Sequence, residues 1–155
     1  MTTNAFEAER MKKALRYLRL FLRDTPALNR LTREEESNNI ELTMAIEFAI
    51  DDWNSTPPFV GYYTIANYPS LYMLVYGAAI HVLASEGVLQ ARNELPFNVG
   101  GTSFVRSNKA GPYLQWLINF DNKYQQNKRN MKVAYNIQRG WGGASSEYNR
   151  LGYLW

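Results

Sequence analysis

The pattern of apolar and polar positions along the chain predicts a mainly α-helical protein, and its central helix is the clearest element. The longest nearly uncharged stretch runs from Tyr68 to Glu94, with apolar residues at helical spacing around most of its circumference. A helix that is apolar on so many sides must be surrounded by other elements. We expect Pro69 in its first turn. The Gly77-Ala78-Ala79 run has little side-chain bulk, so a second helix should pack closely there.

A helix with two different faces is predicted at the start of the chain. Asn4 and Glu7 have the spacing of a capping box, and the helical pattern continues to about Arg23. An apolar stripe and a basic stripe run along it, about 100° apart. The apolar stripe is Met11, Leu15, Leu18 and Leu22, and the basic stripe is Lys12, Arg16, Arg19 and Arg23. The basic stripe is either an ordinary solvated face, a surface near nucleic-acid phosphates, or, less favoured, a membrane-bound surface.

A second helix is predicted from Thr32, where Thr32 and Glu35 again have capping-box spacing, to Trp53. The prolines at positions 57 and 58 follow its end. Its buried side is expected to contain Ile40, Met44 and Phe48, flanked by Ala45, Ala49 and Ile50.

The last predicted helix is the longest, from Pro112 to about Arg139. Its first half has a broad apolar face, whereas positions 122–130 are almost entirely polar and include Lys123, Lys128 and Arg129. A helix so polar in its middle is expected to project beyond a small domain.

Two segments between the helices are rich in aromatic and β-branched residues, namely 57–67 and 96–111. Both are predicted to be extended, with a turn at 98–101 and a short strand at 102–105. They either pair with each other as a small hairpin or interlock between subunits. The predicted fold is therefore a bundle of about four helices with two extended aromatic loops or a short hairpin.

The end of the chain is unusually apolar. A glycine-rich hinge is predicted, formed by Gly140, Gly142 and Gly143, and it divides the chain into a helical domain at 1–143 and a tail at 144–155. The tail carries the anchors Tyr148, Leu151, Tyr153, Leu154 and Trp155. Aromatic anchors of this kind bind to a receptor surface. The alternative is that the tail folds back on its own domain.

Composition excludes several kinds of chemistry. The chain has no Cys and a single His, so thiolate chemistry and sites that need two imidazoles are excluded, and no cofactor is implied. An acid/base enzyme would depend on Asp51, Asp52 or His81; two exposed acids at a helix end and a hydrogen-bonded core histidine are the more common arrangements. We also expect no apolar run of the ~18 residues that a membrane span needs, and no signal peptide.

The chain resembles the head-to-tail adaptor proteins, also called connector or neck proteins, of tailed bacteriophages. The resemblance covers most of the chain from about Thr32 and is carried by YPSLYMLVYGAAI, by LQARNELPFNVGG and by NIQRGWGGASSEY before the aromatic end. Such adaptors form a ring, usually of twelve subunits, around the channel through which the genome passes. Their C-terminal segment docks onto the portal.

The resemblance implies a structural virion protein without enzymatic activity, located in the neck and made in the host cytoplasm. Its expected partners are other copies of the chain, the portal, and a head-closure or tail-terminator protein. The tail anchors would contact the portal. Our own interpretation is that the basic stripe makes transient, non-specific contact with genomic DNA. The alternative function is a helical regulatory protein that binds nucleic acid.

Overall fold

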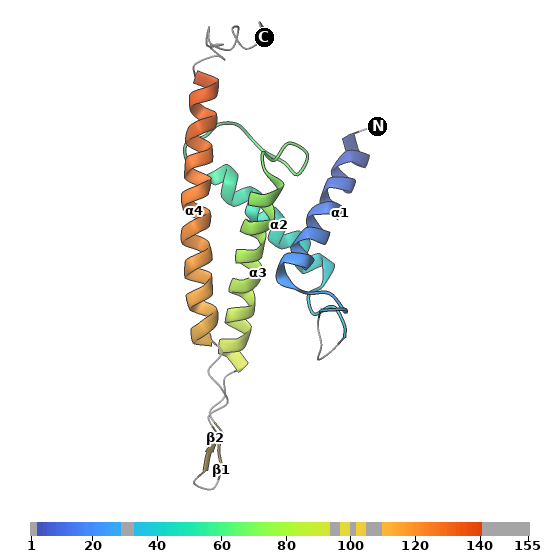
Figure 1. Ribbon diagram of the computed structural model, residues 1–155, viewed down its shortest axis with the longest axis vertical. Coiled ribbons are helices and arrows are strands. Elements are labelled where there is room, and N and C mark those ends of the chain that lie inside the picture. Colours follow the sequence, from blue (N-terminus) through green and yellow to red (C-terminus); the bar gives the residue numbers. More distant parts are fainter. Residues whose placement is uncertain (1–2, 29–32, 94–96, 100–101, 105–109, 141–155) are drawn as a thin grey trace, which may run out of the picture.

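The protein is mainly helical, as the sequence predicts. The computed structural model describes residues 3–28, 33–93, 97–99, 102–104 and 110–140 (Figure 1). In this part of the chain there are four helices and one small hairpin. The elements are α1 (Thr3–Leu22), α2 (Asn39–Ser55), α3 (Leu71–Asn93), β1 (Phe97–Val99), β2 (Thr102–Phe104) and α4 (Ala110–Gly140).

The helix α3 is at the centre of the bundle and contacts α1, α2 and α4. It lies beside α4, while α2 crosses behind it and α1 lies on the side away from α4 (Figure 1). The prediction of a surrounded central helix is therefore confirmed. The largest fully buried apolar side chains of the core are Leu18, Leu42, Ile46, Trp53, Tyr68 and Leu74.

The small residues of α3 allow α4 to approach closely. A Cβ atom added at Gly77 would lie 2.8 Å from the hydroxyl oxygen of Tyr124 and 2.9 Å from its Cζ atom. Ala78 and Ala79 beside it are buried as well. The expected close helix packing at this run is confirmed, and its partner is the buried ring of Tyr124.

The start of α2 differs from the prediction. The helix begins at Asn39, not at Thr32, and Asn38 is its N-cap. The Asn38 side chain accepts a hydrogen bond from the Ile40 amide at 3.1 Å, and the Glu41 carboxylate accepts one from the Asn38 amide at 3.1 Å. Two capping-box patterns occur six residues apart, and the second one is used because Glu35, Glu36 and Ser37 contact Arg19 and Asp24 of the preceding segment.

The buried side of α2 was predicted only in part. Ala45, Ala49 and Ile50 are buried as expected, but Ile40, Met44 and Phe48 are 75, 48 and 48% exposed. The helix has two apolar stripes, and the one that contains Leu42, Ile46 and Trp53 faces the core. Burying the Trp53 stripe removes more apolar area from water, so the stripe of Ile40, Met44 and Phe48 is left outside.

The other helix boundaries agree closely with the sequence. The central helix begins at Leu71, because Ser70 caps it: its carbonyl accepts from the Leu74 amide and its hydroxyl from the Met73 amide. Pro69 therefore precedes the helix and does not lie in its first turn.

In the described part of the chain, the two extended segments do not pair with each other, so the prediction of a hairpin formed between them was wrong. β1 and β2 pair antiparallel, with Phe97 opposite Phe104 and Val99 opposite Thr102, so both strands belong to the second aromatic segment. The hairpin lies at the far end of the α3–α4 pair (Figure 1). Residues 57–67 form no strand, and pack as a loop in which Val60 and Tyr63 are buried.

One apolar helical stretch has membrane-spanning length. By length and composition, Leu71–Leu89 of α3 is the one such candidate in the described residues, so the expectation that no apolar run reaches this length was wrong. Core helices meet the same criterion, and α3 is packed against three other helices here.

Candidate interaction surfaces

The four residues of the basic stripe have different environments. Lys12 and Arg16 are exposed on α1, and Arg23 is exposed just after it, with a left-handed φ of 61°. Arg19 is only 9% exposed and points inward. Sequence reasoning therefore placed Arg19 wrongly, whereas Lys12, Arg16 and Arg23 remain available to a partner.

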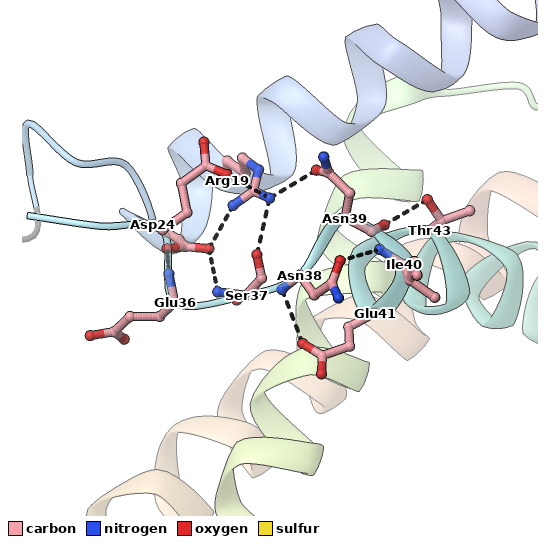
Figure 2. Close-up of polar contacts among 10 residues, drawn as sticks. Arg19, Asp24, Glu36, Ser37, Asn38, Asn39, Ile40, Glu41 and Thr43 are labelled. Carbon is pink, nitrogen blue, oxygen red and sulfur yellow. Dashed lines mark hydrogen bonds and ion pairs between the residues drawn. The ribbon is translucent and has the colours of Figure 1, made fainter. Parts of the chain in front are cut away.

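Arg19 joins the end of α1 to the start of α2 (Figure 2). Its Nη1 atom lies 3.0 Å from Oδ2 of Asp24, and its Nη2 atom donates to the Ser37 carbonyl at 3.0 Å and to Oδ1 of Asn39 at 2.8 Å. The same Nη2 lies 3.0 Å from Oε2 of Glu35. This arginine is a structural residue, because all its charge is directed at groups of its own chain.

Asp24 is the acidic centre of this network. Its carboxylate also accepts from the backbone amides of Glu36 at 2.6 Å and Ser37 at 3.0 Å. Burial alone would raise the pKa of Asp24, but these two backbone hydrogen bonds and the charge of Arg19 together lower it below its ordinary value.

An apolar and basic surface covers the outer side of α1 and the adjoining part of α3. Tyr17, Leu20, Phe21 and Tyr72 are 40 to 58% exposed, and they line a hollow of about 450 Å³ together with Leu71 and Val75. Lys13 lies 5.7 Å from the ring centroid of Tyr17. We call this the α1 surface, and it includes the neighbouring Lys12 and Arg16.

The α1 surface continues into a set of aromatic contacts with α4. Phe21 packs edge-on against Tyr76 at a centroid distance of 5.8 Å and against Phe120 at 6.2 Å. Phe120 in turn contacts Trp116, which is 63% exposed. The exposed aromatic rings are thus held in place by buried ones, so a partner would meet a preformed surface.

A second apolar surface is the outer face of α2. The stripe of Ile40, Met44 and Phe48 is exposed, and Phe48 packs edge-on against His81 of α3 at 5.8 Å. Acidic residues flank this stripe, namely Glu41, Glu47 and Asp51, all exposed, and α2 contains no Lys or Arg. We call this the α2 surface. Sequence reasoning missed it because it assigned this stripe to the core.

The acidic character extends beyond α2. Glu86 of α3 is partly buried, which raises its pKa, and the charges of Glu36, Glu41 and Asp24 raise it further. The side of the bundle around the start of α2 therefore carries an excess of negative charge.

A third group of exposed apolar side chains is at the distal end of the α3–α4 pair. Val88 and Leu89 of α3 are 60 and 47% exposed, and Leu114 and Trp116 of α4 are 58 and 63% exposed. This end extends away from α1 and α2 (Figure 1).

The helix α4 extends beyond α1 and α2 (Figure 1), but two of its lysines are buried, which the sequence did not predict. Lys128 and Lys132 are 1 and 2% exposed and reach the C-terminal end of α2. The Lys128 ammonium lies 2.7 Å from Oδ2 of Asp52 and 5.1 Å from the Tyr124 ring centroid. Lys132 donates to the Thr56 carbonyl and lies 5.5 Å from the Trp53 ring. The negative end of the α2 dipole favours both cations.

The candidate acid/base residues have structural surroundings. Asp52 pairs with Lys128, whereas Asp51 is exposed. His81 is half-buried against Phe48, and burial lowers its pKa although the charges of Asp52 and Asp121 oppose this shift. Among the described residues no group of three or more His, Cys, Asp or Glu could hold a metal ion.

The predicted tail anchors Tyr148, Leu151, Tyr153, Leu154 and Trp155 lie outside the described residues, as do Gly142 and Gly143 of the hinge. Gly140 is the last residue of α4, and a Cβ atom added there would meet nothing within 4 Å. The helical conformation at position 140 therefore does not itself require glycine.

The comparisons with known proteins identify no family. No family model matches the chain, and no curated protein and no solved structure matches it significantly.

Proposed function

We propose that this chain is a structural protein of the neck of a tailed bacteriophage, where copies form a ring that joins the portal to the tail or head-closure proteins around the DNA channel. The observation that supports this best is the distribution of apolar surface. Exposed apolar side chains lie on several sides of the molecule. They occur on the α1 surface, which is connected through Phe120 to Trp116 at the distal end of α3 and α4, on the α2 surface, and in the loop 57–67, where Phe59 and Tyr62 are 73 and 76% exposed. Exposed apolar groups of this kind mark sites of protein association.

A ring subunit needs different contact surfaces on its two sides and further surfaces for the components above and below it. Exposed apolar groups on several sides of a small bundle are suited to this role. A single binding partner would need only one of them. Among the described residues, Asp52 pairs with Lys128 and His81 packs against Phe48, so these two side chains give no support to an acid/base enzyme as a competing function.

Within this proposal the DNA contact is assigned to Lys12, Arg16 and Arg23, without Arg19. Three exposed cations per subunit give weak, non-specific attraction to phosphates, which suits DNA that has to slide through a channel. The tail anchors are proposed to dock onto the portal, with the glycine-rich segment setting their direction.

The test is the solution mass of the purified chain measured by light scattering, alone and mixed with a purified portal ring. A chain that ends at Gly143 is the matched control. We expect the full chain to join the portal ring and the truncated chain to fail. If both chains ignore the portal, the neck assignment is wrong.

The second candidate is a helical nucleic-acid-binding regulator, which the exposed Lys12 and Arg16 on α1 favour. Duplex binding by the free monomer that weakens steeply with salt would support it. The variant Lys12→Glu/Arg16→Glu should then lose that binding. If the wild type does not bind duplex DNA and this variant loses portal binding, the hypothesis of a nucleic-acid-binding regulator is wrong.

A further inference from the structure

The α1 and α2 surfaces carry opposite charges. In α1, Thr3–Leu22 contains five basic residues, Arg10, Lys12, Lys13, Arg16 and Arg19, and two acids, Glu7 and Glu9, which leaves a net charge of +3. In α2, Asn39–Ser55 contains four acids, Glu41, Glu47, Asp51 and Asp52, and no basic residue, which gives −4. Arg19 of α1 and Asp52 of α2 are used in internal ion pairs, and Arg10 of α1 donates hydrogen bonds to the carbonyls of Ala66 and Tyr68.

The charged and apolar residues form adjoining stripes on both helices. On α1, Lys12, Arg16 and Leu20 follow each other at intervals of four, next to Lys13, Tyr17 and Phe21 at the same spacing. On α2, Ile40, Met44 and Phe48 have this spacing, and Glu47 and Asp51 form the neighbouring stripe. Residues four apart lie on one face of a helix, so each surface combines an apolar stripe with a charged one.

The two surfaces are on different sides of the molecule. Phe21 of the α1 surface packs against Tyr76 of α3, and Phe48 of the α2 surface packs against His81 of α3. Positions 76 and 81 are five residues apart, which places their side chains about 140° apart around α3. The surfaces therefore cannot cover each other within one chain.

We propose that the α1 surface of one copy binds the α2 surface of a second copy. The exposed Lys12 and Arg16 then pair with Glu47 and Asp51 of the neighbour, while Tyr17, Leu20 and Phe21 cover Ile40, Met44 and Phe48. A symmetric contact of two α1 surfaces, or of two α2 surfaces, would bring like charges together, which is unfavourable. The contact is heterologous, so a pair of copies still has one free α1 surface and one free α2 surface. Further copies can bind to these free surfaces.

This inference deepens the proposed function, on which it rests for its ring geometry, and it assigns the two faces of the subunit contact. It moves Lys12 and Arg16 from the DNA contact to the subunit interface and leaves Arg23 as the exposed cation of that stripe for DNA. The hollow between α1 and α3 would receive an apolar side chain of the neighbour, since it is lined by Tyr17, Phe21 and Tyr72. The complementary charges determine which surfaces meet.

The first test is charge reversal and exchange. Lys12→Glu/Arg16→Glu and Glu47→Lys/Asp51→Lys alter exposed residues, so both variants should fold. Each alone is expected to weaken self-association at least ~10-fold, and mixing the two should restore assembly to within about threefold of the wild type. The control Lys123→Glu/Arg129→Glu makes the same charge change at exposed positions of α4 and should associate like the wild type. If mixing the two charge variants does not restore assembly, the inference is wrong.

The second test uses the absence of cysteine in the chain. Leu20→Cys and Met44→Cys place one thiol on each surface. Under mild oxidation, with and without the portal ring, the mixture should form a disulfide-linked dimer of one Leu20→Cys and one Met44→Cys chain. Each variant alone should not form one. Dimers of Leu20→Cys alone would show a symmetric contact, and no mixed dimer under either condition would show that the surfaces do not meet; both outcomes overturn the inference.

The two levels of the proposal fail separately. If the wild type joins the portal ring and the charge variants join it equally well, this subunit contact is wrong while the neck function stands. If the charge exchange behaves as expected but no portal is bound, the contact stands and the neck function is wrong.

Discussion

At the scale of single residues, two positions are important for how α4 packs against α3 and α2. Gly77 is one of them, because the Tyr124 hydroxyl fills the space that a side chain would need. Lys128 is another, because its charge is almost completely buried and is balanced by one carboxylate. Neither role depends on the proposed function, and both can be tested by stability measurements.

Gly77→Ala is expected to destabilise the protein. The added methyl group would lie 2.8 to 3.0 Å from three atoms of the Tyr124 side chain, and this residue is only 2% exposed and cannot move freely. Overpacking of this kind costs about 1–3 kcal/mol of unfolding free energy. Gly87→Ala is the matched control in the same helix, with open space at its Cβ position, and should stabilise by about 0.5–1 kcal/mol. Urea denaturation of both variants checks this; equal stabilities would contradict the close contact.

Substitution of Asp52 and substitution of Lys128 should lower the unfolding free energy by different amounts. Asp52→Asn leaves a buried ammonium without its counter-charge and should cost about 3 kcal/mol, the effect of an uncompensated buried charge. Lys128→Met should cost less than ~1 kcal/mol, because the Asp52 side chain is 30% exposed and can regain water.

The double variant Asp52→Asn/Lys128→Met separates this explanation from a general loss of packing. Its unfolding free energy, measured by denaturant titration, should be close to that of Lys128→Met alone. A double variant as unstable as the sum of the two single ones would mean that the residues do not act as a pair.

At the scale of elements, the link between α1 and α2 explains why the second helix starts late. The Asp24 carboxylate accepts from the amides of Glu36 and Ser37, so these residues are held beside the end of α1 and not within a helix (Figure 2). Helix formation then resumes at Asn39, where Asn38 and Glu41 supply the cap.

This link predicts a pH dependence. The pKa of Asp24 is lower in the folded state than its ordinary 3.8, so its ionised form stabilises the fold above that pH, and the stabilisation is lost as the pH falls through the folded pKa. Asp24→Asn should be about 1–3 kcal/mol less stable than the wild type at pH 7. The difference should stay constant down to about pH 5 and shrink below pH 4. Chemical denaturation of both proteins at several pH values measures it, and a difference that does not change with pH would contradict this role.

At the scale of the whole molecule, the bundle is firmly packed at one end and open at the other. Met73 to Ala79 of α3 are buried between the other helices, whereas Val88, Leu89, Leu114 and Trp116 at the distal end are exposed. The densely packed part and the distal part with exposed apolar side chains are thus separated along the α3–α4 pair (Figure 1).

Hydrogen exchange should reveal this gradient. Backbone amides of 85–93 and 111–118 are expected to exchange faster than those of 73–79 and 120–132, because few buried contacts oppose local opening at the distal end. Mass spectrometry of the free chain checks this prediction. Uniform protection along α3 and α4 would contradict it.

The sequence predicted the number of helices, the central position of the Tyr68 to Glu94 segment and the close packing at Gly77. These follow from helical periodicity, capping residues and side-chain size, which are local properties. For the candidate surfaces, Lys12 and Arg16 were identified correctly as exposed cations, since their positions follow from the apolar stripe of the same helix.

Tertiary structure alone decided the rest. Both apolar stripes of α2 had helical spacing, and only the packing of Trp53 against Tyr63 and Tyr68 determined which one is buried. Arg19 and Lys128 looked like surface cations, because their partners Asp24 and Asp52 acquire their roles only when the chain has folded. A sequence specifies which faces a helix has, whereas the choice among similar faces depends on the area and charge that all the other elements offer to it.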